Sequence, residues 1–263
     1  NGSGIIFRKK IEIDDNYLFK INQEVENNSS EQIELYPYAQ LTRKNIPEDL
    51  KGFYILHEGF IAVLDEELKE DDYDDIEEKK IVREAGKGWI GITDKYWMTA
   101  LVPEKGEKFK STFLYQDAYK ANFLLNNPKV IAPSAKANNE IKIFIAAKEV
   151  QTIDAYAEKE NIEKLDLIID WGWFYFFTKP LFFAVDYLFK LTGNFGIAIV
   201  LITVMIRLVF FPLANYSFKS MAKMKALQPE MARLKDLHKD DKVKLQQAMM
   251  ALYKKEQINP ASG

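Results

Sequence analysis

Apolar and polar residues alternate along residues 5–148, the pattern of strands with one face in a core and one in solvent. The alternation is clearest at 11–13 and 18–25. Further strands are predicted at 33–41, 52–64, 88–93, 96–102, 108–115, 119–125 and 141–146, with turn-rich breaks at 26–31, 45–49, 126–128 and 133–139. Many short strands without intervening helices predict an antiparallel sandwich or barrel.

The period changes to that of a helix at 150–166, where Ile153, Tyr156, Ala157, Ile162 and Leu165 recur among charged residues. We therefore expect residues 1–166 to form an all-β domain that ends in a helix.

Residues 171–191 are apolar and long enough to cross a bilayer, but they are interrupted by Lys179, Pro180, Asp186 and Lys190. They are also crowded with aromatic residues, which concentrate at membrane–water interfaces. We favour a helix over 167–192 that lies in the interface, with spanning as the alternative. Its expected anchors are Trp171, Trp173, Phe174 and Phe177.

Residues 193–214 contain an apolar run from Phe195 long enough to span the hydrocarbon core, and it carries Arg207. A charge near the middle of such a helix costs about 2.5–3.5 kcal/mol on insertion scales, and a guanidinium does not deprotonate to escape this cost. Three interpretations remain open: snorkelling to the headgroups, a polar cavity, or contacts with other helices.

Residues 215–263 follow a helical pattern on both sides of a polar turn at 238–242. The apolar positions are Met221, Met224, Leu227, Met231, Leu234 and Leu237 before the turn, and Val243, Leu245, Met249 and Leu252 after it. Asp240 or Asp241 can cap the second helix. We expect an antiparallel hairpin whose methionines form its seam or offer a surface for varied partners.

Charge asymmetry predicts the orientation in the membrane. Ten Lys and Arg residues follow Ala214, whereas four lie between 150 and 194, among seven acidic residues. Positive residues mark the cytoplasmic side, so the hairpin should be cytoplasmic and the β domain extracytoplasmic.

The composition argues against several kinds of chemistry. The 263 residues contain no Cys and two His, His57 and His238, and the net charge is −3. Cysteine-based sites, histidine-based metal sites and specific nucleic-acid binding are therefore not expected, and no cofactor is expected.

Two local motifs have simple explanations. Ten carboxylates lie within 65–78, but no Gly supplies the turn of a calcium loop, so a solvated, mobile loop is expected. Residues 86–91 match G-x-G-x-x-G, but they lead into a strand, whereas dinucleotide binding requires a helix there. Both ends of the chain look cut, which suggests a fragment.

The stretch from about 165 to 260 resembles the YidC family of membrane protein insertases, which also has mitochondrial and chloroplast relatives. The matching motifs are Asp170-Trp-Gly-Trp, Pro180-Leu-Phe, Gly193-Asn-Phe-Gly, Arg207, Phe211-Pro-Leu, Ser220-Met-Ala-Lys-Met, Leu227-Gln-Pro, Asp240-Asp-Lys, Met249-Met-Ala-Leu-Tyr-Lys and Ile258-Asn-Pro. Lys87-Gly-Trp-Ile and the stretch 97–103 resemble the periplasmic domain more weakly.

The resemblance implies a multi-domain protein of the bacterial inner membrane. A periplasmic β-supersandwich would precede the interfacial helix, a membrane helix and a cytoplasmic helical hairpin. Arg207, with Thr203 one turn before it, would line a hydrophilic groove that moves nascent hydrophobic segments into lipid. The hairpin, through Met221, Met224, Met231 and Met249, would receive these substrates.

The implied partners are nascent membrane proteins and lipid, with the Sec translocon and the ribosome as further candidates. No enzymatic activity is implied. The rival hypotheses are a membrane-anchored sugar-binding or mutarotase-like domain, for which His57 is the β region's one histidine, and a structural tether.

Overall fold

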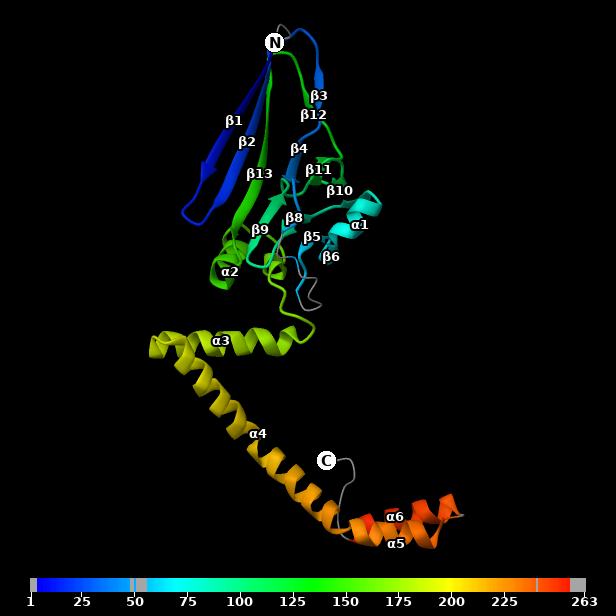
Figure 1. Cartoon of the computed structure of the whole chain (residues 1–263). Coiled ribbons are helices and arrows are strands. Elements are labelled where there is room, and N and C mark those ends of the chain that lie inside the picture. Colours follow the sequence, from blue (N-terminus) through cyan, green and yellow to red (C-terminus); the bar gives the residue numbers. More distant parts are fainter. Residues whose placement is uncertain (1–3, 48–49, 51–55, 240, 256–263) are drawn as a thin grey trace. The chain divides into compact units, whose positions relative to one another are not determined.

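The computed structural model describes residues 4–47, 50, 56–239 and 241–255 (Figure 1). Residues divide into two compact units, Asn1–Tyr175 and Phe176–Gly263. Several predicted features lie outside the described residues: part of the strand at 52–64, part of the turn at 45–49, Asp240, and the Ile258-Asn-Pro motif.

The larger sheet of the first unit has seven strands, all paired antiparallel, in the order β1-β2-β13-β9-β8-β5-β6. These strands are β1 (Ile5–Ile13), β2 (Leu18–Asn27), β5 (Gly59–Leu64), β6 (Glu67–Asp71), β8 (Gly88–Thr93), β9 (Trp97–Val102) and β13 (Lys136–Ala147). Figure 1 shows β13 running beside the hairpin of β1 and β2.

The smaller sheet has four antiparallel strands in the order β4-β11-β10-β7. They are β4 (Tyr38–Arg43), β7 (Ile81–Ala85), β10 (Phe109–Tyr115) and β11 (Tyr119–Leu125), and a separate pair is formed by β3 (Ile33–Leu35) and β12 (Lys129–Ile131). One buried core joins the two main sheets, so the predicted sheet-rich N-terminal domain is confirmed.

Strand β5 lies between two cores, which explains its uninterrupted apolar sequence. Phe60 and Ala62 pack toward the smaller sheet, in the core that contains Phe113 and Phe123. Ile61 and Val63 point to the opposite face, into a second core with residues of the segment after β13. This inner strand, buried on both faces, therefore connects the two cores.

The second core is completed by helix α2 (Val150–Lys159) and the short 3-10 helix η1 (Leu165–Ile168). The single helix predicted at 150–166 is thus wrong in its length. Asn161 and Lys164 adopt positive φ angles of 50° and 52°, and the chain turns between the two helices.

The acidic stretch 65–78 is not the loop that the sequence predicted. Residues Glu67–Asp71 form β6, and Tyr73–Glu78 form the helix α1. Tyr73 and Ile76 are buried in the core between the sheets, so their apolar side chains order a segment that its charge alone marked as solvated. The expectation of strands without intervening helices is corrected in the same way.

Other strand boundaries also differ from the prediction. The segment 33–41 splits into β3 and β4 at Tyr36-Pro37, where proline lacks the N–H that a sheet uses. Strands β7 and β12 were not predicted, and β13 begins at Lys136, inside a predicted turn. The G-x-G-x-x-G segment overlaps the predicted strand β8 at residues 88–91. A side chain at Gly91 would lie 2.4 Å from the Thr99 carbonyl oxygen, so these glycines serve sheet packing.

After the first unit come four helices, α3 (Tyr175–Thr192), α4 (Phe195–Ala226), α5 (Gln228–Leu237) and α6 (Lys242–Lys255). The boundary predicted at 214 is wrong as a helix end, because α4 continues without a break to Ala226. The first arm of the predicted hairpin is accordingly divided at Leu227, and Pro229 sits in the first turn of α5, where it is tolerated.

Candidate functional site

Helix α4 is the one helix among the described residues that is long and apolar enough to cross a membrane. Gly193 turns the chain with a φ of 67°, and the Asn194 side chain then accepts a hydrogen bond of 3.2 Å from the Ile197 amide. This N-cap fixes the start of the helix. Nearly all of the apolar side chains that follow are exposed, so they need lipid or other protein segments around them.

Arg207 and Thr203 are one turn apart and lie on the same face of α4. The Thr203 hydroxyl donates a 2.7 Å hydrogen bond to the Ile199 carbonyl, which leaves its oxygen lone pairs available to water. Arg207 is exposed, and within the described part of the chain it has no ion-pair partner. The same face also carries the small residues Gly196 and Ala214 and the apolar residues Val200 and Phe211.

Helix α3 is amphipathic, with its charged residues on one side. Lys179, Asp186 and Lys190 are spaced by seven and four residues and therefore lie along one line of the helix. Lys190 and Asp186 form an ion pair of 2.7 Å. The opposite line carries Phe177 and Leu181, and α3 does not meet the criteria for a spanning helix that α4 meets.

The predicted interfacial anchors do not all belong to this helix. Trp171, Trp173 and Phe174 precede Tyr175, where α3 begins, so the predicted helix started too early. Gly172 has a φ of 70° and places a turn within this segment. Trp173 is 93% exposed, and Phe174 and Phe177 are also exposed, so their aromatic surface is open to lipid or to a partner.

Helices α5 and α6 contact each other. The Tyr253 hydroxyl lies 3.8 Å from the Met231 sulfur, and Leu252 is buried. Met224, Met231 and Met249 are half-buried. Met221 is exposed, so among the four predicted contact methionines it is the most accessible.

Asp241 makes two contacts at the start of α6. The Asp241 carboxylate accepts a 3.0 Å hydrogen bond from the Lys244 amide and lies 3.3 Å from the Lys244 ammonium. The hydrogen bond from the backbone amide of Lys244 lowers the pKa of Asp241. Asp241 is therefore the N-cap of α6.

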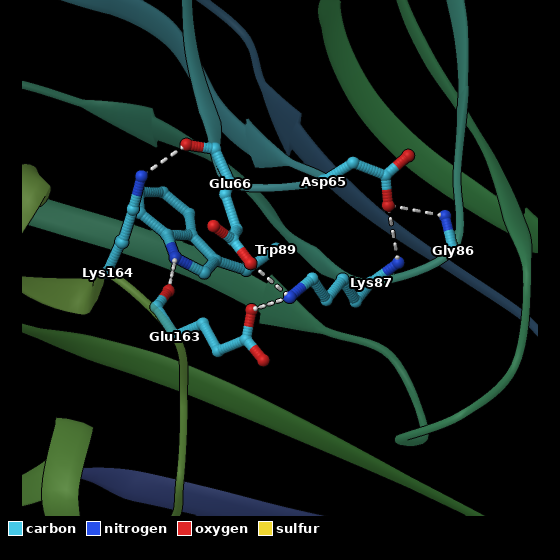
Figure 2. Close-up of polar contacts among 7 residues, drawn as sticks. All are labelled: Asp65, Glu66, Gly86, Lys87, Trp89, Glu163 and Lys164. Atoms are coloured by element: carbon cyan, nitrogen blue, oxygen red, sulfur yellow. Dashed lines mark hydrogen bonds and ion pairs between the residues drawn. The ribbon is translucent and has the colours of Figure 1, made fainter.

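A polar cluster that the sequence did not predict ties the segment after α2 to the larger sheet. Figure 2 shows the Lys87 ammonium between two carboxylates, at 2.6 Å from Glu66 and 2.8 Å from Glu163. Hydrogen bonds to Glu163 and Glu66 raise the pKa of Lys87. The indole N–H of Trp89, a fully buried side chain, donates to the Glu163 carbonyl at 3.1 Å. This cluster contains two residues of the Lys87-Gly-Trp-Ile motif.

Two further contacts complete the cluster. The Lys164 ammonium donates to the Glu66 carbonyl at 2.6 Å, and one Asp65 carboxylate oxygen accepts from the amides of Gly86 and Lys87 at 2.9 and 3.2 Å (Figure 2). The chain from 163 to 164 is thus held against the turns β5–β6 and β7–β8. Sequence periodicity gave no signal for it, because its residues come from three separate segments.

A second set of ionic contacts holds the end of α2. The Glu160 carboxylate is 7% exposed and lies 2.9 Å from Lys20 and 2.8 Å from Lys142. Burial alone would raise the pKa of Glu160, but hydrogen bonds from Lys142 and Lys20 outweigh it and the pKa falls. Glu160 and Lys142 also line a cavity of about 410 Å³ beside Trp89.

His57 does not have the setting of a catalytic acid or base. Its Nε2 lies 2.9 Å from the Phe60 carbonyl oxygen, and its Nδ1 lies 3.4 Å from Asp72. Both ring nitrogens therefore have partners within the protein. Among the described residues no group of His, Asp or Glu is arranged to hold a metal ion.

Comparison with known families gives two adjoining matches. Residues 1–184 match the family model described as the YidC periplasmic domain, and residues 187–263 match the one described as 60Kd inner membrane protein. The division falls within α3.

Individual relatives match the chain over its whole length. The chain is 55% identical over 263 residues to a membrane protein insertase YidC of Pelagibacter ubique, and covers 100% of itself and 47% of that protein. It is 44% identical over 279 residues to the YidC of Methylobacterium sp., with 100% and 44% covered. The chain thus spans about half the length of the curated relatives it matches.

Two solved structures are more distant. An active YidC insertase crystal structure shares 17% identity at a TM-score of 0.31, with 98% of this chain and 69% of that chain covered. A galactose mutarotase related enzyme from Lactobacillus acidophilus shares 11% identity at a TM-score of 0.38, with 54% and 61% covered. Because the two family models together cover nearly the whole chain, it belongs to the YidC family of membrane protein insertases.

Proposed function

We propose that this chain serves a membrane protein insertase, in which α4 lines a hydrophilic groove and Arg207 carries the groove's positive charge. The observation that carries the proposal is the position of Arg207, exposed and without an ion-pair partner in the described part of a spanning helix. Placing such a charge in lipid costs free energy, so its presence in this helix favours surroundings that contain water or a binding partner. Thr203, one turn away, would add a hydrogen-bonding group on the same side.

The mechanism that follows is non-enzymatic. A nascent segment brings a polar or acidic tail that must cross a layer where charge is unfavourable. A hydrated groove shortens the hydrocarbon path, and Arg207 attracts carboxylates in a low dielectric. The apolar part of the substrate then moves sideways into lipid, where its burial supplies the driving force.

The other elements have matching roles. The Lys and Arg excess after Ala214 supports a cytoplasmic hairpin and a periplasmic β domain, which would be of the supersandwich type. The α3 register, with one charged line, supports a helix in the interface, and the aromatic residues 171, 173, 174 and 177 would be its anchors. Met221, the most exposed of the four methionines, is the hairpin residue best placed to meet a substrate.

Substrates would be nascent membrane proteins, and the Sec translocon and the ribosome are the partners that could deliver them. The relatives are named as insertases, so neither a sugar-modifying enzyme nor a simple tether is favoured. The contacts of His57 also argue against acid–base chemistry.

The test compares substitutions of Arg207 in the full-length protein. Arg207→Lys should retain more insertion activity than Arg207→Ala, because lysine keeps the charge but loses the planar fork. The alanine variant should fail most with acidic translocated tails and least with neutral, strongly apolar substrates. Activity is measured as insertion of substrates with tails of different charge, at matched protein levels.

A relocation variant separates the groove from snorkelling. Met205 is exposed and lies about 160° around the helix from Arg207, at a depth that differs by about 3 Å. Arg207→Met combined with Met205→Arg therefore keeps the charge in the helix but turns it to another face. Activity should be lost in this variant. Retained activity would show that any snorkelling arginine suffices and would remove the groove role.

A further inference from the structure

Helix α4 is longer than a bilayer requires. Its 32 residues extend about 48 Å, whereas the hydrocarbon core is about 30 Å thick. The apolar run ends near Ala214, so the last turns lie at and beyond the headgroups while the helix continues unbroken. Because the helix is continuous, the face on which each later residue lies follows from its distance in sequence to Arg207.

Three residues of this emerging part share the face opposite Arg207. Tyr216, Lys219 and Lys223 lie roughly 180°, 120° and 160° around the helix from Arg207. All three are exposed, and the two lysines have no ion pair within the described part of the chain. Lys225 lies five turns beyond Arg207 and therefore on the arginine side.

We propose that Tyr216, Lys219 and Lys223 form a binding site for the phosphate of an anionic phospholipid headgroup. The inference rests on the proposed membrane-spanning role of α4 and adds a lipid ligand to it. It places the groove function and the lipid site on opposite faces of one helix.

The depths of these side chains fit this ligand. Lys219 and Lys223 follow Ala214 by about 7.5 and 13.5 Å of helical rise, and the headgroup layer is about 5–8 Å thick. Lys219 is therefore at headgroup level, and the long stem of Lys223 can reach back to it. Tyr216 is 56% exposed and lies one turn before, where a phenol suits the interface. Two ammonium groups one turn apart can contact the same phosphate.

The test uses the absence of cysteine from the chain. Asn215→Cys gives a single site for a fluorophore, one turn before Lys219 on nearly the same face. The labelled chain is reconstituted in phosphatidylcholine vesicles that contain a spin-labelled quencher, carried either by phosphatidylglycerol or by phosphatidylcholine. Stronger quenching by the phosphatidylglycerol probe measures its enrichment beside the site.

The preference for phosphatidylglycerol should fall about fivefold for each lysine removed, since a basic residue near an anionic surface contributes about 1 kcal/mol. Each of the variants Lys219→Gln and Lys223→Gln should therefore lose part of the preference for phosphatidylglycerol. The double variant should lose almost all of it. Lys225→Gln, about 3 Å of helical rise beyond Lys223 and on the other face, should keep it. Added salt should weaken the preference of the parent chain.

Four results would overturn the site. Equal quenching by both probes in the parent chain would remove lipid selectivity, and an equal loss in Lys225→Gln would reduce it to general attraction. Abolition by millimolar inorganic phosphate would assign the lysines to a soluble anion. Quenching by neither probe would show that α4 is not in the bilayer, which overturns the spanning role and the lipid site together; the first three leave the spanning role intact.

Discussion

Lys87 and Glu163 form an ion pair of 2.8 Å that joins the β7–β8 turn to the segment between α2 and η1. The same ammonium reaches Glu66 at 2.6 Å, so one side chain links three parts of the first unit. The second core lies directly behind, with the Trp89 ring fully buried in it. The path of the chain toward η1 is therefore fixed by both polar and apolar contacts.

Trp89→Phe should destabilise the β domain by about 1–3 kcal/mol. The ring volume is partly kept, but the buried Glu163 carbonyl loses its 3.1 Å hydrogen bond from the indole. Thermal or urea unfolding followed by circular dichroism measures the change. Trp97→Phe is the matched control, because Trp97 is 59% exposed and its replacement should change stability by less than about 0.5 kcal/mol. A control effect as large as that of Trp89 would contradict the role of the hydrogen bond.

Lys87→Met should lower the unfolding temperature by less than Trp89→Phe does. Its ion pairs are partly exposed, and such pairs contribute little and are screened by salt. The difference between parent and Lys87→Met should therefore shrink as sodium chloride is added. A difference that is independent of salt would contradict the assignment of the effect to these screened ion pairs.

Glu160 should make stability depend on acid pH. Burial would raise its pKa, but the hydrogen bonds from Lys142 and Lys20 lower it below the ordinary value of 4.5. A carboxylate with a lowered folded pKa stabilises the fold above its unfolded pKa, and that contribution is lost as pH falls through the folded pKa. Glu160→Gln should therefore flatten the fall in stability below about pH 4.5 and cost about 1–2 kcal/mol at pH 7, since both lysines reach solvent.

A double-mutant cycle separates this charge effect from packing. Lys20 and Lys142 are replaced by Met in the parent and in Glu160→Gln, and urea unfolding is measured at pH 7 and pH 3.5. The interaction free energy between Glu160 and the lysines should be clear at pH 7 and smaller at pH 3.5. An interaction of the same size at both values would exclude titration of Glu160 as the cause.

Helix α3 should stay in the interface because of its charged line. In the parent chain, lipid-borne quenchers placed near the headgroups should quench Trp171 and Trp173 most strongly. Replacing Lys179, Asp186 and Lys190 together with Leu removes the charges and should allow deeper insertion. The depth of maximal quenching should then move toward the bilayer centre. Quenching that is already strongest from the centre in the parent would mean that α3 spans.

The two ends of α4 should face opposite sides of the membrane. Gln116 lies at an exposed turn of the β domain, and Lys235 is exposed on α5. Single cysteines at these positions, in the full-length protein in intact cells, should react differently with an impermeant thiol reagent. Gln116→Cys should be labelled without permeabilising the inner membrane, and Lys235→Cys only after it. Labelling of both under the same condition would refute the orientation.

Local pattern was sufficient where apolar residues and flanking turns mark a strand without reference to distant segments. Strands β8 and β11 have the predicted bounds, because their apolar positions and flanking turns agree. The prediction of a loop at 65–78 failed because Tyr73 and Ile76 are two apolar residues among many charged ones. Their burial depends on strands from other parts of the sequence. The predicted end of the helix at 214 was also wrong. The apolar run ends there, but the helical backbone continues to Ala226.

For the candidate site, the chemistry of single residues was enough to identify Arg207 but not the contacts of Lys87. Arg207 stands out from sequence because a charge in an apolar run is rare, and the structure keeps it exposed on α4. The contacts of Lys87 were not predictable, since Glu66 and Glu163 approach it only through the pairing of β5 with β8 and the turn after α2. Long-range partners of this kind carry no periodic signal.

Helix α4 stays helical past Pro212, which lacks the N–H for one bond of the ladder, and this continuity has a mechanical consequence. A helix without a break transmits torsion along its axis, so a rotation at Arg207 is repeated at Lys219 and Lys223. Turning the guanidinium by one residue step, about 100°, would swing the lysines through the same angle. The azimuth of Arg207 is thus coupled to contacts made several turns away, and a change in those contacts would bias the direction in which the arginine points.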